Sequence, residues 1–222
     1  MSISPAFAQL SADKKAQRIK ASYSIVSGRA PSAGELDFWM KQPDFTLREL
    51  VSKHTAYAAT EPSFKRDLII KSYRHALGRQ PSEGEIAYWA PGADTYNNLM
   101  KNHVSWLQGN PGEYEKVIKA SYLTAMGREP NGDELAWWKK QNVYSYAVLV
   151  HCHKDYIARN RTGPFNMVSN LVSNVMNAFP ISSDIAQEVQ GVMGLVGGTP
   201  VLAQGAAGLQ SMLGAILPNF SL

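Results

Sequence analysis

The residues most capable of chemistry are the histidines and the single cysteine of this 222-residue chain. His151, Cys152 and His153 are consecutive, but residues two apart on a helix point to different faces, so the two imidazoles cannot easily act together. His54, His103 and His153 recur at nearly equal intervals. A metal site would require these three side chains to converge. Because equivalent positions of a repeated unit lie a full unit apart, we expect ordinary packed or surface histidines, and a small packed cysteine.

The sequence contains none of the common catalytic motifs. It lacks the His-Glu-x-x-His zinc motif, the Gly-x-Ser-x-Gly nucleophile turn, the phosphate-binding loop and a strand-linked Gly-x-Gly-x-x-Gly. Glu83 and Glu85 lie at an expected helix start, where the helix dipole favours negative charge, so they need no acid–base role. We therefore expect a protein that is not an enzyme, with no cofactor and no metal.

Composition excludes several further classes of protein. The 22 Lys and Arg against 18 Asp and Glu give a net charge of +4 and a pI near 9.1, too mild to indicate a specific nucleic-acid partner. A single cysteine cannot form a disulfide framework within the chain. Charged residues make up 18% and the mean hydropathy is -0.24, so the chain reads neither as disordered nor as a polytopic membrane protein.

One pattern of residue types occurs three times and determines the expected fold. Counting from a tyrosine, Gly follows at +5, Arg at +6, Pro at +8, Glu at +12 and Trp at +16. More loosely matched are Leu50, Leu99 and Leu149, four residues before each of the three spaced histidines. The matched residues are Tyr23, Gly28, Arg29, Pro31, Glu35 and Trp39; Tyr73, Gly78, Arg79, Pro81, Glu85 and Trp89; Tyr122, Gly127, Arg128, Pro130, Glu134 and Trp138.

Each copy contains residues that are typical of helix ends and helix starts. The glycine suits a left-handed helix end, and the proline prevents continuation. Ser32-x-x-Glu35, Ser82-x-x-Glu85, Asn131-x-x-Glu134 and Thr46-x-x-Glu49 are capping-box patterns that start new helices. We expect the tyrosine and the aromatic-Trp pair to pack between helices, and the arginine to bind helix-end carbonyls or the capping glutamate. Alternation with period two is missing, so no sheet is predicted.

These signals predict an all-α chain: a tandem array of three helical repeats of about three helices each, followed by an apolar helical C-terminal segment. The expected divisions are an arm at 1–12, repeats at about 13–62, 63–112 and 113–161, and the segment 162–222. Ser11 or Asp13 is expected to start the first helix.

The pattern resembles a bacterial helical repeat domain of unknown function that occurs in exported, surface-layer-type and toxin-repeat proteins. The resemblance rests on the tyrosine, the Gly-Arg-x-Pro turn and the aromatic-Trp pair, and it covers about residues 16–160. It implies helical interaction or spacer units, and it supplies no catalytic residues.

The C-terminal segment differs sharply in composition. Residues 165–222 carry two charges, Asp184 and Glu188. Glycine, proline and glutamine interrupt every stretch long enough to span a bilayer. We expect the segment to pack on a partner, on copies of itself or on the repeats. The alternative that it is an export signal read by a type I secretion channel stays open. The apolar stripe, with the candidate interface residues at its start, is Phe165, Val168, Leu171, Val172, Val175, Met176 and Phe179.

We expect a structural or assembly protein whose repeats form a scaffold and whose C-terminal segment mediates oligomerisation or docking, on a bacterial surface or in a virus particle. Two alternatives stay open: a secreted adhesion or carbohydrate-binding module exported by a type I system, and a membrane-active protein with an inserting C-terminal hairpin. Residues 1–12 lack the basic and apolar stretches of a cleavable signal. The expected location is therefore extracellular or cell-surface without a Sec signal, with the virion and the cytoplasm as alternatives.

Overall fold

The computed structural model describes residues 5–158, and this part of the chain is helical without any strand. The expected all-α class is confirmed for these residues. The segment 162–222, with its candidate interface at Phe165, Val168, Leu171 and Val172, lies outside them. The helices are α1 (Pro5–Ser27), α2 (Ala33–Lys41), α3 (Leu47–Ala59), α4 (Pro62–Leu77), α5 (Glu83–Trp89), the 3₁₀ turn η1 (Ala90–Gly92), α6 (Tyr96–Gly109), α7 (Pro111–Met126), α8 (Gly132–Gln141) and α9 (Tyr146–Ala158).

The short helices begin with the capping boxes that the sequence predicts. At α2, α5 and α8 the side chain of Ser32, Ser82 or Asn131 accepts a hydrogen bond from the amide three residues on, and the glutamate there accepts one from the cap amide. Thr46 and Glu49 do the same for α3. Each box satisfies amides that the first helical turn leaves without partners.

The start of the first helix differs from the sequence-based expectation. It already includes Pro5, the first residue that the structure describes, so the start expected at Ser11 or Asp13 was wrong and residues 5–12 of the expected arm are helical. The expectation gave priority to hydrogen-bonding cap residues. Two later helices do begin at a proline, α4 at Pro62 and α7 at Pro111. A proline at the first helical position has its φ already fixed and has no amide hydrogen to leave unpaired.

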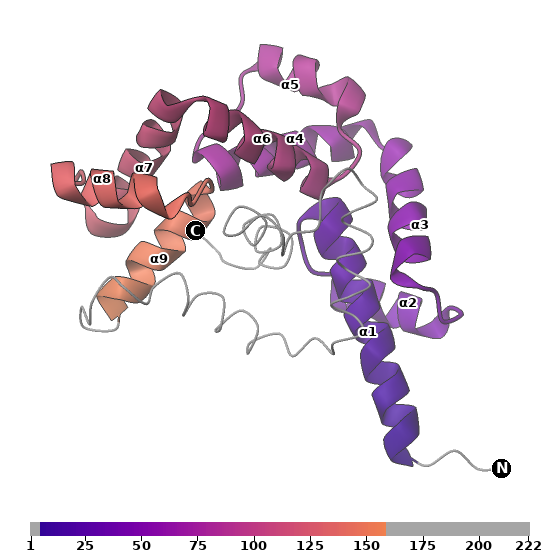
Figure 1. Cartoon of the computed structure of the whole chain (residues 1–222). Coiled ribbons are helices and arrows are strands. Elements are labelled where there is room, and N and C mark those ends of the chain that lie inside the picture. The colour runs from indigo at the N-terminus through magenta and orange to yellow at the C-terminus, as the bar shows by residue number, and fades with distance from the viewer. Residues whose placement is uncertain (1–4, 159–222) are drawn as a thin grey trace.

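Packing joins the helices into three successive groups, α1–α3, α4–α6 and α7–α9, which follow one another along a curved row (Figure 1). Within each group the first helix packs on the third. Between groups, α1 also contacts α6, and α4 contacts α9. One apolar core runs through the second and third groups; its largest fully buried members are Trp138, Tyr96, Ile69, Leu99, Met100, Leu107, Ile118 and Leu149.

Candidate functional site

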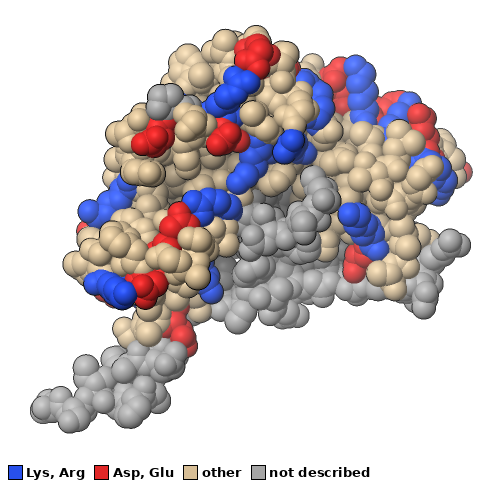
Figure 2. All heavy atoms as spheres, turned by 180° about the vertical axis from the view of Figure 1, so that it is seen from behind, with Lys and Arg blue, Asp and Glu red and all other residues tan. Residues whose placement is uncertain are grey.

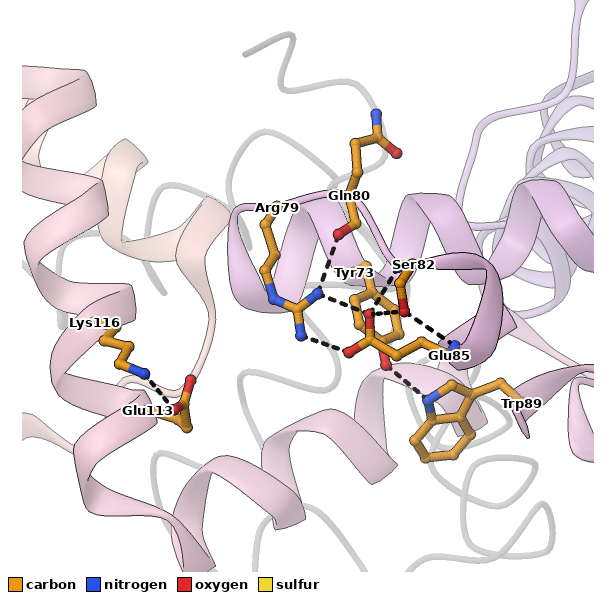
Figure 3. A network of polar contacts seen from close by, with 8 residues as sticks. All are labelled: Tyr73, Arg79, Gln80, Ser82, Glu85, Trp89, Glu113 and Lys116. Carbon is orange, nitrogen blue, oxygen red and sulfur yellow. Dashed lines mark hydrogen bonds and ion pairs between the residues drawn. The ribbon is translucent and has the colours of Figure 1, made fainter. Parts of the chain in front are cut away.

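Each group contains one cluster of a tyrosine, a tryptophan and a histidine. In the second group, the Trp89 indole Nε1–H donates to the Tyr73 hydroxyl at 2.9 Å (Figure 3). The His103 ring lies edge-on to both, with its centroid 4.6 Å from Tyr73 and 5.1 Å from Trp89. The same arrangement recurs for Tyr23, Trp39 and His54 and for Tyr122, Trp138 and His153.

A second recurring contact links the turn to the start of the short helix. Arg79 donates to both carboxylate oxygens of Glu85, at 3.0 and 2.7 Å, and to the Gln80 carbonyl at 3.1 Å (Figure 3). Its guanidinium also lies 5.0 Å from the centre of the Tyr73 ring. This hydrogen bonding lowers the pKa of Glu85 to about 2. The equivalent pairs are Arg29 with Glu35 and Arg128 with Glu134.

The turn residues of the pattern also have defined places. Gly28, Gly78 and Gly127 end α1, α4 and α7 with φ of 62°, 70° and 70°, a left-handed conformation that glycine adopts without a Cβ clash. The three prolines, Pro31, Pro81 and Pro130, directly precede the N-cap residues of α2, α5 and α8.

The three spaced histidines lie in three separate clusters, and burial keeps them neutral. Burial lowers the pKa of His54, His103 and His153 to about 4 each. The Ser72 hydroxyl donates to a backbone carbonyl, so the contact of 3.1 Å between His103 Nε2 and Ser72 Oγ requires the imidazole to donate. His153 and Ser121 repeat this contact at 3.0 Å. Within residues 5–158, no three His, Cys, Asp or Glu side chains are grouped to hold a metal ion.

The cysteine beside His153 is not a reactive thiol. Cys152 is buried among apolar side chains of the core. Burial, with a smaller contribution from Asp155, raises the pKa of its thiol to about 12, so the nucleophilic thiolate does not form near neutral pH.

Tyrosine rings join successive groups by packing on the left-handed glycines. A Cβ added to Gly28 would lie 2.5 Å from Cγ of Tyr96, the first residue of α6. A Cβ on Gly78 would meet the ring of Tyr146, the first residue of α9, in the same way. Nothing in the described part of the chain lies within 4 Å of the corresponding position on Gly127. The sequence identified these glycines as helix ends but gave no sign of their second role.

Polar contacts support the same two junctions. The Lys71 amino group of α4 donates to the Ser27 carbonyl at the end of α1, at 3.1 Å. The Ser145 hydroxyl, at the start of α9, donates to the His75 carbonyl near the end of α4, at 3.1 Å. The Lys71 and Ser145 bonds satisfy carbonyls that the last helical turn leaves open. Within the second group, His75 Nδ1 lies 2.6 Å from the hydroxyl of Tyr96, whose ring packs on Gly28.

The aromatic-Trp pair behaves differently from the expectation that both rings pack between helices. In the first two groups the tryptophan is half-buried, but the residue before it points outward: Phe38 is 55% and Tyr88 77% exposed. Neighbouring helical residues project about 100° apart, so they face different directions there. In the third group, Trp138 is buried in the core and Trp137 packs against the same core, as expected. In the first two groups the residue three after the spaced histidine is also accessible, at 66% for Tyr57 and 42% for Trp106.

A groove of about 720 Å³ lies on the third group. Its walls come from the end of α7, from α8 and from the last turn of α9. Basic and acidic side chains are interspersed over the face shown in Figure 2, without a large area of one sign. The lining residues are Tyr122, Ala125, Met126, Arg128, Asp133, Glu134, Trp137, Trp138, His153, Tyr156 and Ile157.

Comparisons with known proteins give no match: no family model, no curated protein and no solved structure matches this chain. Among the helices of residues 5–158, none combines the length and the hydropathy that crossing a membrane requires.

Proposed function

We propose that this protein is a non-enzymatic structural or assembly protein. Residues 13–161 act as a tandem array of three helical repeats, and the apolar segment 162–222 mediates oligomerisation or docking. The recurrence of the Tyr–Trp–His cluster and of the Arg–Glu pair in all three helix groups carries this proposal. Such repeats pack mainly on their neighbours and leave extended surfaces free for partners.

The polar side chains of the cluster in the second group favour a structural role. The charges of Arg79 and Glu85 neutralise each other in a two-point ion pair, and the Trp89 indole N–H donates to the Tyr73 hydroxyl. His103 is neutral and hydrogen-bonded to a serine. A catalytic group would instead need a free proton donor or acceptor facing a substrate site. The setting we propose is a bacterial surface or a virus particle.

The proposal is tested by removing the C-terminal segment and measuring mass in solution. The full chain and a variant ending at Gly163 are compared by light scattering at several concentrations. We expect the full chain to form a defined oligomer or to bind a partner, and the shortened chain to be monomeric with its repeats still folded. A full chain that is monomeric and binds nothing would contradict the assigned role of the segment.

The exposed aromatic side chains favour a second candidate, a carbohydrate-binding or adhesion module. Each of the first two groups exposes two rings, Phe38 with Tyr57 and Tyr88 with Trp106. Exposed rings of this kind stack on the apolar faces of sugars.

A glycan array probed with the full chain tests this second candidate. Wild type is compared with the double variant Tyr88→Ala, Trp106→Ala, which removes two exposed rings. The matched control is Leu123→Ala, which removes a side chain that is 50% exposed but not aromatic. Binding that is lost only in the double variant supports a carbohydrate partner, and an array without any bound glycan rejects it.

A further inference from the structure

The third helix group is covered less completely than the two before it. The residue four positions after the spaced histidine is buried in the first two groups, where Ala58 is 3% and Leu107 0% exposed. In the third group that residue is Ile157, which is 46% exposed and lines the groove. An exposed isoleucine beside half-buried Ala125 and Met126 leaves an apolar surface at this end of the array.

Two helices show what covers this position elsewhere. Directly after α3 comes α4, and directly after α6 comes α7; each contacts the helix it follows. Both are 16 residues long and both begin at a proline, Pro62 and Pro111. The hydrogen bonds to Glu85 are the main cause of the raised pKa of Arg79, and Glu113 in the first turn of α7 lies close enough to add a small electrostatic contribution. In the third group, the corresponding arginine is Arg128, and it lines the groove.

The sequence after α9 contains a segment that shares the first proline and the length of these two helices. Pro164 is followed by the apolar stripe, and Pro180 limits the stretch to residues 164–179, which matches the length of α4 and α7. The stretch carries no charge, which suits walls made mainly of aromatic and aliphatic side chains. Arg128 and Glu134 form an ion pair with each other, so an uncharged segment in the groove leaves neither of these two charges without a partner.

We infer that residues 164–179 of the same chain occupy the groove on the third group, in the position that α4 and α7 hold on the groups before them. The apolar stripe covers Met126 and Ile157 and so closes the open end of the array, as terminal units of stacked repeats require. This inference goes beyond the proposed function, because it concerns a contact within one chain. It leaves residues 180–222 as the part available to partners.

Hydroxyl-radical footprinting of the full chain tests this contact, with mass spectrometry reporting modification at Met126. Three proteins are compared: wild type, Val168→Asp at the centre of the apolar stripe, and Asn170→Asp, which adds the same charge on the opposite side. Met100 is fully buried and serves as the internal measure that the repeats stay folded. Wild type is also measured over a wide range of dilution.

The expected result is a several-fold faster modification of Met126 in Val168→Asp, wild-type rates in Asn170→Asp, and protection of Met100 in all three. Protection of Met126 in wild type must be independent of concentration. Equal rates at Met126 in wild type and Val168→Asp would overturn the inference. Protection lost on dilution would also overturn it, because the occupant would then be a second copy. Neither outcome depends on the mass measured by light scattering, so failure here is distinct from failure of the proposed function.

Discussion

Two left-handed glycines in equivalent turns provide a matched pair of substitutions. Gly78 and Gly127 have the same φ of 70°, and each ends the first helix of its group. They differ in surroundings, because the Tyr146 ring lies against Gly78 whereas nothing in the described part of the chain contacts the Cβ position of Gly127. Alanine at each position therefore imposes the same backbone strain but a different packing cost.

The expected magnitudes follow from these two contributions. A non-glycine residue in the left-handed region costs about 1–2 kcal/mol of folding free energy, and this applies equally to both variants. Overpacking against a well-packed ring adds about 1–3 kcal/mol, and this applies only to Gly78→Ala. The loss of unfolded-chain entropy on replacing glycine by alanine cancels between them. We therefore expect Gly78→Ala to reduce the free energy of unfolding by about 1–3 kcal/mol more than Gly127→Ala.

Urea unfolding of the full chain, followed by circular dichroism, measures this difference. Gly28→Ala supplies a repeat measurement, because its added Cβ would lie 2.5 Å from the Tyr96 ring. If Gly127→Ala proved as destabilising as Gly78→Ala, the reasoning that tyrosine packing distinguishes the two turns would be refuted.

Three further outcomes are expected. His103 and His153 take up protons below about pH 6.5 in the unfolded chain, but when buried in the folded protein they stay neutral down to about pH 4. The free energy of unfolding therefore decreases as the pH falls from about 6.5 to about 4, and urea midpoints at pH 7 and 5 measure this decrease. Ser82→Ala removes a helix cap and lowers the free energy of unfolding by about 1 kcal/mol. Arg79→Met removes an exposed ion pair and lowers it by less than about 1 kcal/mol, and thermal melts of the two variants test this order. Iodoacetamide should label Cys152 in urea but not in the native protein.

Local features of the fold were predictable because their causes are local in sequence. A capping box needs only residues three apart, so Ser32-x-x-Glu35 can be recognised without knowledge of the fold, and the structure contains it. The left-handed conformation of Gly78 follows in the same way from a glycine before an arginine and a proline. The helical residues of α1 before Ser11 were missed because serine and aspartate, which are common helix caps, also occur inside helices.

Contacts between groups were not predictable from spacing. Nothing near Gly28 in sequence indicates that a ring from Tyr96 will lie against it. Likewise, the pattern Phe38-Trp39 does not reveal which of the two rings faces outward, because that depends on where the neighbouring helix lies. Such facts depend on tertiary packing, which overrides local preference. The groove on the third group also results from tertiary packing, and the repeated sequence pattern did not predict it.

The junctions between groups constrain the order in which contacts can form during synthesis. The bond between Trp89 and Tyr73 joins residues 16 apart, whereas the bond between Ser145 and His75 joins residues 70 apart. A nascent chain leaving the ribosome amino end first can complete the cluster of one group while the next is still being translated. The turn at Gly78 stays exposed to water until Tyr146 has left the ribosome and can pack on it. Pauses in translation between these residues would prolong that interval.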